Sequence, residues 1–152
     1  MELILWRHAD AENGEPDMLR ELTPLGQRQA AHVADWLNVR LPAGCRIVCS
    51  PATRTQQTVD TLGRDYEVME ALGPGADPAA VLRALHWPHG HGTVLAVGHQ
   101  PTVGRLAALL MTGRAHDWDV PRGALWWFEQ REAYNPHSLT LKAVVTPELI
   151  LK

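Results

Sequence analysis

An arginine and a histidine stand side by side near the start of the chain, directly after a run of apolar residues. Leu3-Ile4-Leu5-Trp6 is typical of a short buried strand, and Arg7-His8 follows it at once. In an open α/β sheet the ligand crevice lies outside the carboxyl ends of the strands. A guanidinium is a rigid fork of donors for an anion, and an imidazole can be neutral and nucleophilic near pH 7. The pair suggests a phosphate that is held and attacked, although two polar residues at a solvent-facing strand end would look the same.

Two further strand ends carry matching side chains. Ser50-Pro51-Ala52-Thr53-Arg54 follows the apolar stretch 45–49, and Gly98-His99-Gln100-Pro101 follows the β-branched run 93–97. In a parallel sheet these ends face one crevice, where two arginines would clamp phosphoryl oxygens and helix N-termini would add backbone donors. Considered separately, Arg54 could equally be a solvated helix residue, and His99 could equally be a hydrogen-bonded loop histidine. Their joint placement favours a phosphate site, to which His99 would add a hydrogen bond.

The elements that must position these side chains alternate between strand-like and helix-like segments, which implies parallel strand pairing. We expect strands at Glu2–Trp6, Arg46–Cys49, Tyr66–Met69, Thr93–Val97, Ala124–Gln130 and Ser138–Val145, and helices at Pro24–Val39, Ala52–Leu62, Pro78–Leu85 and Thr102–Met111. No helix separates the last two strands, so that pair should be antiparallel. The prediction is an α/β fold, a three-layer α/β/α sandwich with a mostly parallel central sheet.

Helix starts and faces can also be predicted locally. A polar residue followed by proline, as in Thr23-Pro24, Ser50-Pro51 and Asp77-Pro78, is typical of a helix N-cap with proline in the first turn. The three- and four-residue spacing of the first helix predicts an inner face of Ala30, Val33, Ala34 and Leu37, with Arg28, Gln29 and Asp35 available to solvent. Gly113 is a plausible helix end.

Composition bounds the class of protein. A chain of 152 residues with 45% hydrophobic and 20% charged residues predicts one globular domain spanning 1–152. A net charge of -3 and the lack of a Lys/Arg-rich block argue against a nucleic-acid partner. The sequence contains neither a secretion signal nor an apolar run long enough for a membrane helix, and Cys45 and Cys49 are predicted to be buried thiols. We therefore expect a cytoplasmic protein without a membrane partner.

Four segments together resemble the histidine phosphatase superfamily, which has the phosphoglycerate mutase-like fold. They are Leu5-Trp6-Arg7-His8-Ala9, Leu22-Thr23-Pro24-Leu25-Gly26-Gln27-Arg28-Gln29-Ala30, Cys49-Ser50-Pro51-Ala52-Thr53-Arg54-Thr55-Gln56-Gln57-Thr58 and Val97-Gly98-His99-Gln100-Pro101. The resemblance covers residues 3 to about 106. The short length and the stretch Gly98 to Gly104 look most like the small SixA-type phosphohistidine phosphatase branch. Ala9 stands where the family most often has glycine, and its small side chain should preserve the turn.

The resemblance implies a mechanism that the residue types support. His8 would attack phosphorus in line and form a phosphohistidine intermediate, which water then hydrolyses. Arg7, Arg54 and His99 would bind the phosphoryl group and stabilise charge on its oxygens. No cofactor and no metal are expected, because two guanidiniums and helix termini supply the positive charge.

The general acid for the leaving group is the least determined role. In larger relatives the acid is a carboxylate from a segment after the second helix, and Glu70, the favoured candidate, lies where that segment would be. Asp77 at a helix start and Asp10 beside His8 are the other candidates. A SixA-type enzyme would also work without a strong acid, because a phosphoramidate leaving group is basic enough to be protonated before it departs. In that case Glu70 is structural.

The sequence is compatible with three functions. The first is dephosphorylation of phosphohistidine in a signalling protein, which an open crevice without a large capping insertion favours. The second is hydrolysis of a small phosphate ester such as a sugar or nucleoside phosphate. The third is a binding module that holds phosphate without turnover, which the presence of all four residues, Arg7, His8, Arg54 and His99, argues against.

Three other features attract attention. His86, His89 and His91 form a loop cluster, but flexible imidazoles without carboxylate or thiolate partners make weak metal sites. Trp118, in the loop Asp117-Trp118-Asp119, is a candidate for lining a substrate groove. Arg20 would meet substrate or an acidic partner, or simply face solvent.

Overall fold

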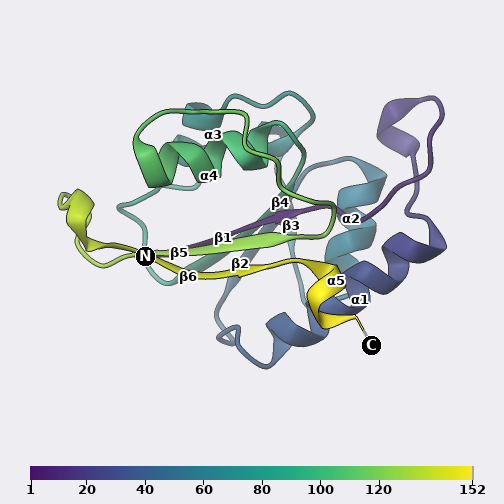
Figure 1. The fold of residues 1–152 in the computed structure, drawn as a ribbon, viewed down its shortest axis with the longest axis horizontal. Coiled ribbons are helices and arrows are strands. Elements are labelled where there is room, and N and C mark those ends of the chain that lie inside the picture. The colour runs from purple at the N-terminus through teal and green to yellow at the C-terminus, as the bar shows by residue number, and fades with distance from the viewer. Residues whose placement is uncertain (152) are drawn as a thin grey trace.

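The computed structural model describes residues 1–151, and within this range it contains one six-stranded sheet with the order β3-β2-β4-β1-β5-β6 (Figure 1). The strands are β1 Glu2–Arg7, β2 Arg46–Cys49, β3 Glu67–Val68, β4 Thr93–Gly98, β5 Leu125–Gln130 and β6 Leu139–Val145. The α-helices are α1 Pro24–Asn38, α2 Thr53–Asp60, α3 Pro78–Ala84, α4 Thr102–Thr112 and α5 Pro147–Ile150, and 3-10 turns lie at Asp17–Leu19, Glu70–Leu72 and Pro136–Ser138. All six predicted strands and all four predicted helices are confirmed, and no predicted end differs from the observed one by more than two residues.

The direction of the strands brings the three predicted strand ends to one edge. β1 pairs in parallel with β4, and β2 pairs in parallel with both β4 and β3. β5 runs antiparallel to its neighbours β1 and β6. The carboxyl ends of β1, β2 and β4 therefore lie together at the middle of the sheet, as the alternation of elements predicted.

Helices cover both faces of the sheet, which confirms the three-layer architecture. Because side chains alternate along a strand, Ile4 and Trp6 of β1 join one core cluster while Leu3 and Leu5 join the other. Figure 1 shows α3 and α4 over one face, with α1 and α2 covering the other. The predicted inner face of α1, Ala30, Val33, Ala34 and Leu37, is fully buried.

Several local expectations are confirmed by hydrogen bonds. Thr23 caps α1 by accepting from the Gly26 N–H at 2.9 Å, and Asp77 caps α3 by accepting from the Ala80 N–H at 3.0 Å. Gly113 ends α4 in the left-handed conformation, with φ at 82°. Within residues 1–151, no helix is long and apolar enough to cross a membrane.

Two local expectations are wrong, and both errors concern long-range contacts. Ser50 does not cap α2, whose N-cap is Ala52; the Ser50 hydroxyl instead contacts His99 on the neighbouring strand end. Gln29 was expected to face solvent, but its side-chain oxygen accepts a hydrogen bond from the Asp10 N–H at 2.9 Å. Both side chains therefore support the segments that follow β1 and β4.

Candidate active site

One pocket of about 230 Å³ lies at the carboxyl edge of the sheet and brings the four predicted residues together. It is lined by Arg7, His8, Arg54 and His99, with Ala11, Asn13, Asp17, Arg20, Pro74, Gln100 and Arg122 completing the wall. Among these described residues, four arginines face a single carboxylate. This charge balance suits a dianion such as a phosphoryl group.

The His8 ring is held in one tautomer. Its Nδ1 lies 2.8 Å from the carbonyl oxygen of Ala9, and a carbonyl can only accept, so Nδ1 carries the proton. In the neutral ring the lone pair is then on Nε2. Burial lowers the pKa of His8 to about 4, and the positive charges of Arg54 and Arg7 act in the same direction. His8 is therefore neutral at pH 7, the form in which an imidazole is a nucleophile.

Arg54 is buried under the 3-10 turn that begins at Asp17. Its Nη1 donates to the Asp17 carbonyl at 2.9 Å, and its Nη2 donates to the Asp17 carboxylate at 3.2 Å. Arg54 is only 3% exposed, and its Nε has no hydrogen-bond partner among the described residues. A rigid, buried fork with a free N–H is a suitable donor for a phosphoryl oxygen.

Arg7 is anchored from the side of β5. Its Nη1 donates to the carbonyl of Val120 at 2.8 Å, while its buried Nε finds no partner within residues 1–151. Burial lowers the pKa of Arg7 from its ordinary value, which still leaves an arginine charged at neutral pH. Two separately anchored guanidiniums thus present free donors beside His8.

His99 lies against His8 and is oriented by Ser50. The two imidazole centroids are 5.3 Å apart, and the His99 Nε2 lies 2.7 Å from the Ser50 hydroxyl. That hydroxyl already accepts from the Ala52 N–H, so its own proton is available to donate to Nε2. Burial lowers the pKa of His99 to about 3, and the neutral ring then has its proton on Nδ1, a buried atom without a partner in the described part of the chain.

The low pKa of His8 predicts its titration. In an NMR titration of the ligand-free protein, we expect the His8 ring to protonate with a midpoint near 4, well below the ordinary histidine value of about 6.5. The unfolded chain takes up this proton first, so the free energy of unfolding should fall as the pH falls from about 6.5 towards 4. A His8 midpoint near 6.5 would contradict this burial of a neutral ring.

The three carboxylates considered as general acid lie outside this pocket. Glu70 is exposed at the start of a 3-10 turn, and Asp77 is occupied as the N-cap of α3. Asp10 accepts from the Thr23 hydroxyl at 2.7 Å and pairs with Arg122 at 3.2 Å. The one carboxylate that lines the pocket, within residues 1–151, is Asp17, and the positive charges of Arg54 and Arg20 hold its pKa below the ordinary value.

Sequence reasoning missed Asp17, Asn13, Arg122 and the role of Ser50. The first two lie in the polar loop after β1 and Arg122 in the loop before β5, where neither periodicity nor a strand end marks a residue as functional. Arg20 does line the pocket, where it donates to Asp17 at 3.1 Å and to the carbonyl of Glu12 at 3.0 Å. The charge of this loop was the available signal, because the loop after β1 carries Asp17, the carboxylate that pairs with the buried Arg54.

Trp118 and the histidine cluster, which the sequence also singled out, do not line the pocket. Trp118 packs against Trp126 with ring centroids 5.7 Å apart and belongs to the core on the α4 side of the sheet. His89 packs against the ring of Tyr134. Within the described residues, no group of three or more His, Cys, Asp or Glu side chains is arranged to hold a metal ion.

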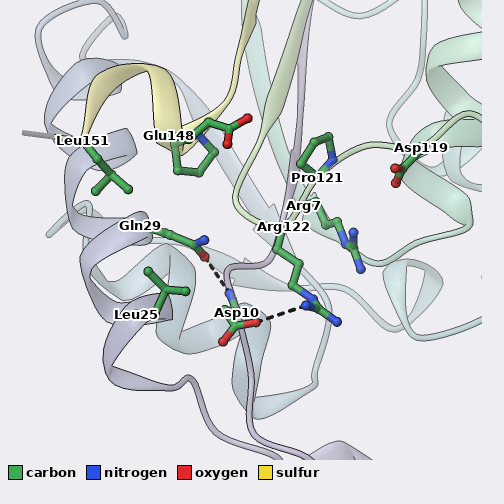
Figure 2. Close-up of a pocket in the computed structure, with 10 residues that line it drawn as sticks. Arg7, Asp10, Leu25, Gln29, Asp119, Pro121, Arg122, Glu148 and Leu151 are labelled. Carbon is green, nitrogen blue, oxygen red and sulfur yellow. Dashed lines mark hydrogen bonds and ion pairs between the residues drawn. The ribbon is translucent and has the colours of Figure 1, made fainter.

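A second cavity of about 540 Å³ adjoins the first (Figure 2). Arg7 and Arg122 line both cavities, so they form the boundary between them. Figure 2 shows the Arg122 guanidinium directed towards Asp10, to which it is bonded, with Glu148 between Leu151 and Pro121 and with Asp119 on the Arg7 side of Pro121. We call the first cavity the phosphate pocket and the second the side cavity.

The fold is an α/β sandwich, and its pocket places a neutral histidine beside buried arginines, an arrangement that suits a phosphoryl group. Residues 3–73 match the family profile described as histidine phosphatase superfamily (branch 1). The phosphohistidine phosphatase SixA of Escherichia coli K12 is 32% identical over 123 residues, which is 74% of this chain and 76% of that protein. An uncharacterized protein of Mycobacterium tuberculosis is 37% identical over 108 residues, 68% of each chain.

Solved structures agree. A putative SixA from Nakamurella multipartitia has a TM-score of 0.77 at 29% identity and covers 96% of this chain and 95% of its own. The protein histidine phosphatase SixA in complex with tungstate has a TM-score of 0.77 at 25% identity, covering 98% of this chain and 99% of that one. The chain belongs to the histidine phosphatase superfamily and is a phosphatase, with relatives in the SixA branch as the four motifs predicted.

Proposed function

We propose that this protein is a metal-independent phosphatase that forms a phosphohistidine intermediate on His8 and removes phosphate from phosphohistidine in a signalling protein. The observation that carries the proposal is the neutral His8 ring, which bears its lone pair on Nε2 inside a pocket with two guanidiniums. A histidine whose role was to bind phosphate by charge would be protonated. This one is kept neutral by burial, which suits a nucleophile.

The reaction has two displacements. First, His8 Nε2 attacks phosphorus and forms a new P–N bond while the P–N bond of the substrate breaks, and the leaving imidazole keeps the proton it acquired before departure. Water then attacks the phosphohistidine, the bond to His8 breaks, and phosphate leaves as His8 recovers its neutral form. A leaving group that is protonated in advance needs no strong acid, consistent with the positions of Glu70, Asp77 and Asp10 outside the phosphate pocket.

Arg7, Arg54 and His99 stabilise the transferring group. Charge in phosphoryl transfer is spread over three equatorial oxygens, and fixed donors in a buried pocket stabilise it without reorganisation. The buried N–H groups of Arg7 and Arg54 that have no partner in residues 1–151 are matched to this role. Their two positive charges replace the metal ion that many phosphoryl-transfer enzymes use.

Two kinds of observation support the proposed substrate class: the position of the phosphate pocket and the relatives of the protein. The phosphate pocket adjoins a larger surface cavity, so we expect it to admit a phosphate carried on a protruding side chain. The relative from Escherichia coli is a phosphohistidine phosphatase, and a similar SixA structure holds tungstate, a tetrahedral oxyanion. The thiols of Cys45 and Cys49 are free, which suits work in the reducing cytoplasm.

The test compares substrates. A histidine-phosphorylated carrier protein should be hydrolysed with a kcat/KM about 100-fold higher than sugar phosphates and nucleoside monophosphates. A higher kcat/KM for one of these metabolites would contradict the proposed substrate and favour the small-ester alternative. Phosphate binding without turnover of any substrate would instead leave a phosphate-binding module.

A further inference from the structure

The backbone that carries His8 is held by hydrogen bonds to distant segments. The His8 N–H donates to the Gly98 carbonyl at 3.1 Å, and the His8 carbonyl accepts from the Gly123 N–H at 3.0 Å. The next two amide groups, those of Ala9 and Asp10, donate to side chains instead of to backbone carbonyls. Two side chains therefore decide how the peptide groups next to His8 are oriented.

Gln29 fixes the peptide group between Ala9 and Asp10. Its side-chain oxygen accepts from the Asp10 N–H at 2.9 Å, and Figure 2 shows this side chain reaching from α1 to that amide. The same planar peptide group carries the Ala9 carbonyl, since the C=O of one residue and the N–H of the next lie in one plane. That carbonyl accepts the Nδ1 proton of His8 at 2.8 Å. Gln29 thereby sets the direction of the acceptor that selects the His8 tautomer.

Thr58 fixes the peptide group on the other side of Ala9. Its hydroxyl oxygen accepts from the Ala9 N–H at 3.1 Å and donates its own proton to the Arg54 carbonyl at 2.7 Å, one turn earlier in α2. The donated bond orients the hydroxyl, which leaves its lone pairs for the Ala9 amide. Thr58 and Ala9 are both fully buried, so no solvent water is in contact to replace this acceptor. Thr58 therefore anchors the His8–Ala9 peptide group to the helix that carries Arg54.

From these contacts we propose that Gln29 and Thr58 are positioning residues, which act through the backbone to keep the lone pair of His8 on Nε2. They do so by holding the Ala9 carbonyl against Nδ1. A neutral imidazole has two tautomers, and the partner of one ring nitrogen decides which nitrogen carries the proton. Neither Gln29 nor Thr58 lines the phosphate pocket, so neither touches the phosphoryl group itself. The inference rests on the proposed function and deepens it, because the position of the lone pair matters only if His8 attacks phosphorus.

The experiment removes each side-chain acceptor and then restores it. Thr58→Val and Gln29→Met delete the accepting oxygen at nearly unchanged size, whereas Thr58→Ser and Gln29→Glu keep an oxygen at that place. We expect kcat to fall about 10-fold or more in Thr58→Val and in Gln29→Met, because small displacements of reacting atoms are costly. The Ser and Glu variants should recover most of the loss. The affinity for inorganic phosphate, measured by calorimetry, should stay at the wild-type value in all four, because the donors of the phosphate pocket are unchanged.

The measurement that is specific to positioning is the tautomer of His8. Nitrogen-15 NMR of the ligand-free protein at pH 7 should show a protonated Nδ1 in wild type and both tautomers in Thr58→Val and Gln29→Met. The chain has eight histidines, so the spectrum of His8→Asn assigns the signal. A purely structural role would lower the unfolding temperature and leave the tautomer as it is.

Two matched controls make the same chemical changes elsewhere. Thr93→Val removes a buried hydroxyl that bonds Glu2 at 3.1 Å, at the start of β4 and so at the opposite end of this strand from the pocket. Gln27→Met changes an exposed glutamine of α1, two residues from Gln29. Neither control residue lines the phosphate pocket or the side cavity. Both controls should keep the wild-type kcat and the wild-type His8 tautomer.

The outcomes separate this inference from the proposed function. Wild-type kcat and a protonated Nδ1 in folded Thr58→Val and Gln29→Met would overturn the positioning role and leave the proposed function intact. A loss of phosphate affinity as large as the loss of kcat would also overturn it, because the two residues would then act on the phosphate donors. If wild type formed no phosphohistidine on His8, the proposed function would fail, and this inference with it.

Discussion

Replacing His8 with alanine should abolish the covalent intermediate and lower kcat by about 10⁴-fold or more, the largest effect expected for any single substitution in this protein. The reason is that Nε2 of His8 is the lone-pair atom in the phosphate pocket. The measurement is phosphoryl labelling with a small phosphodonor such as phosphoramidate. Wild type should yield an acid-labile, base-stable phosphoprotein and His8→Ala should yield none.

Two further variants make this result specific to the nucleophile. His8→Asn keeps a polar side chain of similar size and should also lack the label, which separates loss of the reactive atom from loss of packing. His32→Ala, the same change at a partly exposed histidine of α1 that lines neither cavity, should label and turn over like wild type. A label that persists in His8→Ala would move the covalent step to another residue, with His99, 5.3 Å away between ring centroids, the first to test.

Arg54→Ala is expected to lower kcat/KM by about 10³-fold, because it removes a preorganised donor from a buried site. In Arg54→Lys, kcat/KM should fall less, by about 10²-fold, because lysine keeps the positive charge. Lysine lacks the planar guanidinium, which bonds Asp17 with its Nη atoms and leaves its Nε–H without a partner among the described residues. Steady-state kinetics gives the loss, and calorimetric titration with inorganic phosphate should show weaker binding in both variants. Arg46→Ala, a change at a more exposed arginine paired with Glu67, should have little effect.

The stability of the Arg54 variants must be measured alongside. Removal of Arg54 leaves the Asp17 carboxylate without its buried partner, and thermal unfolding will report any loss of the turn Asp17–Leu19. The carboxylate is half exposed and can be rehydrated, so we expect the fold to persist. A kcat/KM within about threefold of wild type in folded Arg54→Ala would contradict the role of this guanidinium.

Much of the fold could be predicted because local signals agree with the tertiary arrangement. The spacing of Ala30, Val33, Ala34 and Leu37 determined the buried face of α1, and the Thr23-Pro24 pair determined its start. Such signals arise between residues a few positions apart, where backbone geometry dictates which side chains share a face. The errors at Ser50 and Gln29 occurred where a polar residue with a plausible local role bonds to a distant segment instead.

By itself the sequence determined the order of strands and helices and the strand ends that carry Arg7, His8, Arg54 and His99. The tertiary structure alone decided what surrounds them: the Asp17 turn on Arg54, 37 residues away, and the Val120 carbonyl on Arg7, 113 residues away. It also decided the side cavity, whose walls come from the segment around the end of β1, from α1, from the loop before β5 and from the segment 147–151. The physical reason is that parallel strands of one sheet necessarily end at a common edge, whereas loop contacts depend on the path of the whole chain.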